Sequence, residues 1–133
     1  MAAISELCDQ LGVVEALDAA VGPIKQRDRG FGAGGLLVGL AAAQLAGEDF
    51  LVGLDRQRAD RVGQVIAPVP GLASTTAAGL ARRITGPQWI DLEAGVARVS
   101  ERMLARVPVA RRTRLGESVT IDLDATDVEG VRA

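Results

Sequence analysis

Two closely spaced acids near the end of the sequence are the residues best suited to chemistry. Asp122 and Asp124 lie two positions apart in a run, residues 118–127, where apolar and polar residues alternate. In a β-strand, residues i and i+2 share a face, so the two carboxylates would project together. Such carboxylates can hold Mg²⁺ or Mn²⁺, although two-metal phosphoryl transfer needs further acids from later elements. The other interpretation is an amphipathic strand with a solvated acidic face.

Missing residue types exclude several other kinds of site. The chain has no His, and Cys8 is its only Cys. A Cys/His zinc site, a Ser-His-Asp or Cys-His catalytic arrangement and an intrachain disulfide are therefore excluded. The longest apolar stretch, residues 31–46, is shorter than the roughly 20 residues of a spanning helix. Because the first residues also lack signal-peptide features, we expect a cytoplasmic protein with no membrane partner.

Apolar residues at helical spacing precede the acidic run. They predict helices over residues 4–21, 34–46, from 49 onward, 74–84 and 89–107. The stretch 34–46 is apolar on most sides and should lie in the middle of a bundle. Phe50, Leu51 and Leu54 should face inward from the third helix, and Ser74 should be the N-cap of the fourth.

The periodicity changes after a basic connector at residues 111–114. Before it the apolar period is 3.6, and after it the period is 2. We therefore expect a mainly α protein. Residues 1–110 would form a helical domain with a DNA-binding role, and residues 111–133 would form a linker and the start of a second domain.

Arginines in the middle of the chain are candidate DNA contacts. A short helix, a loop with Pro and Gly, and a helix ending in two arginines could form a helix-turn-helix-like unit. Arginine suits phosphate contacts, since its guanidinium binds oxygen pairs in a fixed geometry. The candidates are Arg56, Arg58, Arg61, Arg82 and Arg83. The alternative is an ordinary solvated helical surface, on which Asp55 and Asp60 pair with these arginines.

A glycine-rich segment, residues 30–35, precedes the second predicted helix. It lacks a preceding strand and the Gly-Lys-Ser/Thr ending of a phosphate-binding loop. We interpret it as a flexible helix entry.

Several stretches resemble bacterial insertion-sequence transposases of the DDE class. Residues 120–129 are similar to the first catalytic strand of that class. Three further stretches, residues 37–49, 54–60 and 70–83, resemble its helical amino-terminal region. The resemblance implies that an RNase H-like fold starts at the acidic strand. It implies Asp124, in an Asp-x-Thr context, as the first catalytic and metal-binding Asp, with Asp122 as second choice. For the full-length parent, it also implies Mg²⁺ or Mn²⁺ as cofactor and the terminal inverted repeats of an insertion element as DNA partner.

The acids that would complete such a site are missing from this sequence. The second Asp and the Glu of the family lie further downstream, and residues 130–133 depart from the family pattern. We therefore expect a transposase fragment, truncated after its first catalytic Asp and inactive alone. Two alternatives are a non-catalytic helical module that associates with DNA or dimerises, with a full-length transposase as one partner, and a remnant without function.

Overall fold

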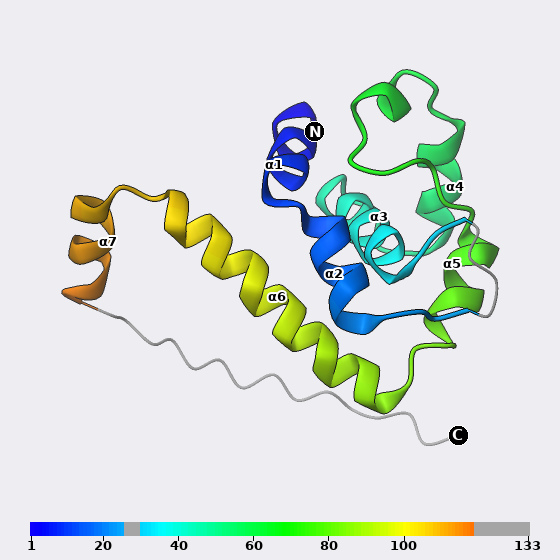
Figure 1. Ribbon diagram of the computed structural model, residues 1–133. Helices are drawn as coiled ribbons and strands as arrows, with labels where there is room; N and C mark the ends of the chain where they lie inside the picture. The colour runs from blue at the N-terminus through cyan, green and yellow to red at the C-terminus, as the bar shows by residue number, and fades with distance from the viewer. Residues whose placement is uncertain (26–29, 119–133) are drawn as a thin grey trace, which may run out of the picture.

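The computed structural model describes residues 1–25 and 30–118 of the chain (Figure 1). Its helices are α1 (Ala2–Leu11), α2 (Val13–Val21), α3 (Ala33–Leu45), α4 (Val52–Ala59), the 3₁₀ turn η1 (Gly63–Ile66), α5 (Ser74–Ala81), α6 (Gly86–Arg106) and α7 (Val109–Gly116). The mainly α class expected from the sequence is confirmed. No strand occurs in the described ranges, and the strand expected from residue 118 lies almost wholly outside them.

The single helix expected over residues 4–21 is wrong, because Gly12 divides it into α1 and α2. Gly12 has φ 59°, in the left-handed region that glycine adopts without steric cost. Its N–H donates to the carbonyl of Asp9 (3.0 Å), and its own carbonyl accepts the first bond of α2 from Ala16 (3.0 Å). One glycine thus ends the first helix and begins the second.

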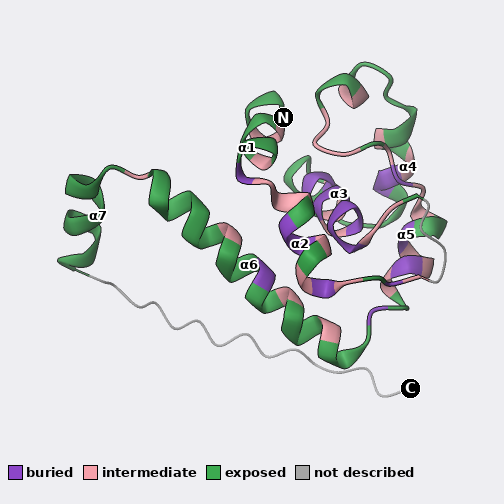
Figure 2. Cartoon of the chain, in the orientation of Figure 1, coloured by how far each residue is buried: buried purple, intermediate pink, exposed green. Residues whose placement is uncertain are grey.

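Helix α3 lies at the centre of the fold, as its all-round apolar pattern predicted. Ala33 and Leu36 have no exposed surface, and Gly34 lies against the backbone of α2 at Val14. Figure 2 shows buried residues along α3 and on the parts of α2, α4 and α5 that face it. The main core cluster is Val21, Ile24, Ala33, Leu36, Ala43, Leu54, Leu72, Ala77, Leu80 and Ile84.

The sequence placed the start of the next helix too early. After α3, Gly47 takes φ 86°, and Glu48 N–H donates to the carbonyl of Ala43 (3.0 Å). This pattern closes the end of a helix in a Schellman turn. Because α4 begins only at Val52, Phe50 lies before it and is 75% exposed. Leu51 is also exposed and only Leu54 faces the core, so the inward orientation expected of Phe50 and Leu51 is wrong.

Helix α6 is the longest described helix and packs along one side of the core (Figure 1). Its first turn is fixed by Gln88, whose Oε1 accepts from Thr85 N–H (3.0 Å) and whose Nε2 donates to the carbonyl of Val21 (3.1 Å). Gly95 is its one buried residue and lies against Ala20 of α2. No described helix is both long enough and apolar enough to cross a membrane.

Two arginines connect the second half of α6 to the end of α1. Arg102 Nη1 donates to the carbonyls of Leu11 (2.8 Å) and Gly12 (3.3 Å), and Arg106 Nη1 donates to Gln10 Oε1 (2.8 Å). Cations at a helix C-terminus are favourable, because the last carbonyls carry partial negative charge. These contacts hold the second half of α6 against the end of α1.

The segment expected as a basic connector, residues 111–114, is helical and belongs to α7. Figure 1 shows α7 at the far end of α6, away from the core. All of its residues are exposed.

Candidate nucleic-acid interface

The carboxylate of Asp55 on α4 caps the start of α5. It accepts hydrogen bonds from the backbone N–H of Ser74 (3.1 Å) and from its hydroxyl (2.5 Å). The N-cap position itself is Ala73, so the expected capping role of Ser74 is wrong. The hydrogen bonds from Ser74 hold the pKa of Asp55 below its ordinary value of 3.8. A negative charge at a helix N-terminus is favourable, since the first N–H groups lack partners within the helix.

Asp60 caps the start of η1 in a similar way. Its Oδ1 accepts from the backbone N–H groups of Val62 (3.1 Å) and Gly63 (3.0 Å), at the start of η1. Asp55 and Asp60, which the sequence suggested as partners of the arginines, therefore accept hydrogen bonds from backbone N–H groups. Arg56 pairs with Glu48 through Nε and Oε1 (3.1 Å), which holds the pKa of the Glu48 carboxyl below its usual value.

The other four candidate arginines have no acidic partner in the part of the chain that the structure describes. They are Arg58, Arg61, Arg82 and Arg83, and no carboxylate oxygen of these described ranges lies within 4.0 Å of their guanidinium nitrogens. All four are exposed. Arg58 is close enough to Asp55 for its charge to help lower the pKa of that carboxyl, so the charges of Arg61, Arg82 and Arg83 are the most available to an external anion.

The five candidate arginines form two groups. Arg56 and Arg58 lie on α4, with Arg61 just after its end, while Arg82 and Arg83 follow the last residue of α5. Because Asp55 holds the start of α5 against α4, the length of α5, about 12 Å, lies between the groups. The structure does not gather the five into one cluster.

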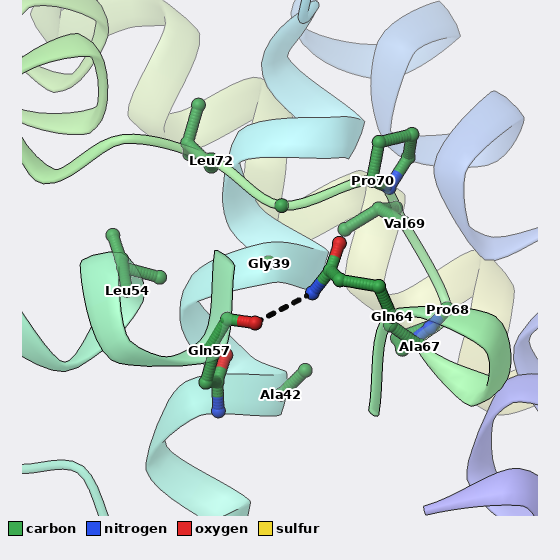
Figure 3. A pocket seen from close by; sticks show the side chains of 11 residues that line it. Gly39, Ala42, Leu54, Gln57, Gln64, Ala67, Pro68, Val69, Pro70 and Leu72 are labelled. Carbon is green, nitrogen blue, oxygen red and sulfur yellow. Dashed lines mark hydrogen bonds between the residues drawn. The ribbon is translucent and has the colours of Figure 1, made fainter. Parts of the chain in front are cut away.

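The connection between α4 and α5 differs from that of a short helix-turn-helix. It runs from residue 60 to residue 73 and contains η1, whereas the DNA-binding motif uses a turn of about 3–4 residues. Gln64 Nε2 donates to the carbonyl of Gln57 (3.0 Å), as Figure 3 shows. A Cβ on Gly71 would lie 2.9 Å from the Cα of Arg58. The connection is therefore held tightly against α4.

The hollow between this connection and the helices α3 and α4 is too small for a ligand. It is lined by residues from α3, α4 and the connection, among them Gly39, Leu54 and Leu72 (Figure 3). Its volume of about 20 Å³ is room for roughly one water molecule. A second hollow, of about 260 Å³, is lined by the same connection at Asp60, Gln64 and Pro68. The exposed arginines lie on either side of the connection.

A further basic surface lies on α7, a segment that the sequence indicated only as a connector. Arg111, Arg112 and Arg114 are exposed there, and the helix contains no acid. The signal was present in the sequence as a run of arginines, but its helical form was not expected.

The structure describes no metal site. Within its described ranges, no group of three or more His, Cys, Asp or Glu residues could hold a metal ion. The acids singled out for that role, Asp122 and Asp124, lie outside the described residues. Their metal-binding role stays a prediction from the sequence.

Comparison with known proteins does not identify the chain. No protein-family model, curated protein or solved structure matches it. The resemblance to DDE transposases, drawn from the acidic run and the helical stretches, stays a prediction from the sequence.

Proposed function

We propose that this chain corresponds to the helical amino-terminal region of an insertion-sequence transposase of the DDE class, and that its described part binds DNA. The observation that supports DNA binding is that the nearby acids accept hydrogen bonds from backbone N–H groups. Asp55 and Asp60 cap helical turns near Arg58 and Arg61, and no described carboxylate oxygen lies within 4.0 Å of these two arginines or of Arg82 and Arg83 at the end of α5. Exposed guanidinium groups form charge-assisted, often bidentate hydrogen bonds with phosphate oxygens.

The binding should be weak and tolerant of sequence. The whole chain has a net charge of −2, so only local arginine groups attract the duplex. Contacts to phosphate position a protein on DNA but carry no sequence information directly. In the parent enzyme, this region would help to hold the terminal inverted repeats of the element.

Catalysis in the parent would begin with the acidic strand. By the resemblance, Asp124 would hold Mg²⁺ or Mn²⁺ through a carboxylate oxygen, with Asp122 as the alternative, and both offer the oxygen donors that these cations prefer. The bound metal supplies positive charge that stabilises phosphoryl transfer. The described helical region would bind and orient the DNA.

Paired substitutions test the proposed surface. Binding of a fluorescent DNA duplex would be measured by anisotropy for the parent chain and for Arg82→Ala/Arg83→Ala. Affinity should fall about 5- to 30-fold, since two exposed ionic contacts are worth about 1–2 kcal/mol together.

The matched control is Ala94→Glu/Arg98→Ala on α6, which lowers the net charge by the same two units at exposed positions away from the proposed DNA contacts. The proposal expects this control to bind much more tightly than Arg82→Ala/Arg83→Ala. Equal losses in both variants would mean that only total charge matters, and unchanged binding in Arg82→Ala/Arg83→Ala would reject the surface.

A further inference from the structure

One side of α6 is apolar and exposed along the length of the helix. Its five large apolar side chains keep between 46% and 69% of their surface accessible: Trp89, Ile90, Val96, Met103 and Leu104. The opposite side packs on α2 at the buried Gly95. Figure 2 shows how much of α6 is exposed beyond its contact with the core. A concentration of exposed apolar side chains on one side of a helix marks an interaction site.

The apolar residues of this side form two rows with a spacing of seven. The rows are Trp89-Val96-Met103 and Ile90-Ala97-Leu104. A spacing of seven is close to two helical turns, so each row follows the helix axis as a seam. Larger side chains stand at both ends of the rows, and smaller ones stand in the middle.

This order of sizes is nearly symmetric about the middle of α6, and it suits a second copy of the same helix. If two α6 helices crossed antiparallel with Val96 against Val96, Trp89 would meet Met103 of the second copy. Ile90 would likewise meet Leu104. The smaller residues at the crossing would let the two axes approach to about 8–10 Å.

Charge decides between the two orientations. Glu93 lies between the two rows, one helical turn after Trp89. A parallel pair would place Glu93 opposite the same residue of the second copy, and like charges in an interface are costly. An antiparallel pair would place it beside Ser100 of the second copy, whose hydroxyl can donate to the carboxylate.

The available area is enough for a weak dimer. At about 200 Å² for a large apolar side chain, the five residues expose on the order of 500 Å² per protomer. A symmetric pair would then bury on the order of 1,000 Å², close to the minimum for a specific interface.

We propose that the exposed side of α6 is a homodimer interface, in which two copies cross antiparallel at Val96 and Ala97. The small area makes the association weak and dependent on concentration. The inference is separate from DNA binding, because it uses α6 and the proposed DNA contacts lie on and beside α4 and α5.

Sedimentation equilibrium tests the interface. The chain would be measured from about 1 to 500 µM, a range that suits an interface near the minimum size. Val96→Glu should weaken association at least tenfold, because each copy then places a charge at the crossing. Ala94→Glu adds the same charge at an exposed position on another side of α6 and should leave association unchanged. Circular dichroism would show that both variants keep their helices.

Disulfide trapping tests the orientation in a Cys8→Ser background. Val96→Cys should cross-link to itself. Trp89→Cys and Met103→Cys should each fail alone but cross-link when mixed, since only an antiparallel pair brings these two positions together.

Three results would overturn the proposal. They are a monomer over the whole concentration range, a dimer that Val96→Glu does not weaken, and efficient self-linking of Trp89→Cys, which would show a parallel pair.

Discussion

Replacing Gly34 with Ala should destabilise the protein by forcing α2 away from α3. A Cβ at Gly34 would lie 2.2 Å from the carbonyl oxygen of Val14 and 3.0 Å from its Cα. Backbone atoms cannot rotate aside, so α2 would have to move by about 1 Å to restore ordinary contacts. The movement would also disturb Asp18 on α2, whose Oδ1 accepts from Gly34 N–H (2.7 Å) at the start of α3.

The expected loss of stability follows from two unfavourable contributions and one favourable contribution. Overpacking a rigid core costs about 1–3 kcal/mol, and weakening a helix cap costs about 1 kcal/mol. Alanine in place of glycine returns up to about 1 kcal/mol of helix propensity. The net loss in the free energy of unfolding should be about 2 kcal/mol.

Urea unfolding followed by circular dichroism measures this loss. The matched control is Gly79→Ala on α5, where a Cβ would meet no atom within 4 Å. The control should gain up to about 1 kcal/mol from helix propensity alone. If Gly34→Ala proved as stable as Gly79→Ala, the close approach of α2 and α3 would be wrong.

Asp55→Asn should flatten the loss of stability in acid. Hydrogen bonds from Ser74 lower the folded pKa of Asp55 below the unfolded value, so its stabilisation is complete above the unfolded pKa and disappears as the pH falls through the folded pKa. Thermal melts from about pH 5 to 2 would show that the melting temperature of the variant falls less steeply with falling pH. The same pH dependence in parent and variant would contradict this prediction. Leu54→Ala, which empties a core position, should cost about 2–5 kcal/mol in urea unfolding, whereas Phe50→Ala on the surface should change stability by less than about 0.5 kcal/mol; similar losses would place Phe50 in the core. The 133-residue chain should not cleave DNA with Mg²⁺ or Mn²⁺ in a gel assay, since one strand cannot surround two metals. In a full-length parent, Asp124→Asn should abolish cleavage but keep DNA binding, and full activity in that variant would move the catalytic role elsewhere.

The sequence predicted elements well where the apolar period alone decides. The helix expected over residues 34–46 is found at Ala33–Leu45, because its apolar residues can be buried only at the centre. The apolar period did not reveal the break at Gly12, since a glycine inside a helical pattern can continue the helix or end it. It also missed the late start of α4, which depends on the turn at Gly47 and leaves Phe50 outside the helix.

The exposure of the candidate arginines was predictable from the sequence, whereas the hydrogen-bond partners of the nearby acids were not. Arg58, Arg61, Arg82 and Arg83 are exposed, as both phosphate contacts and an ordinary solvated surface would require, so their DNA-binding role stays a prediction. The role of Asp55 depends on Ser74, which lies 19 positions away and reaches it only in the folded chain. No local pattern in the sequence indicates such a contact.

The role of the arginines of α6 also depends on contacts with residues far away in the sequence. Arg102 binds the carbonyl of Leu11, 91 positions away, and is therefore a structural group. Local sequence alone does not distinguish it from the exposed arginines of α7.

The dependence of DNA affinity on salt tests the central claim most directly. The logarithm of the binding constant should fall linearly with the logarithm of salt concentration, with a slope of about −0.9 for each phosphate contact. Four exposed arginines allow a slope of up to about −4, and Arg82→Ala/Arg83→Ala should reduce its magnitude by about 2. No binding at low salt, or a slope that this double substitution leaves unchanged, would contradict DNA binding through these arginines.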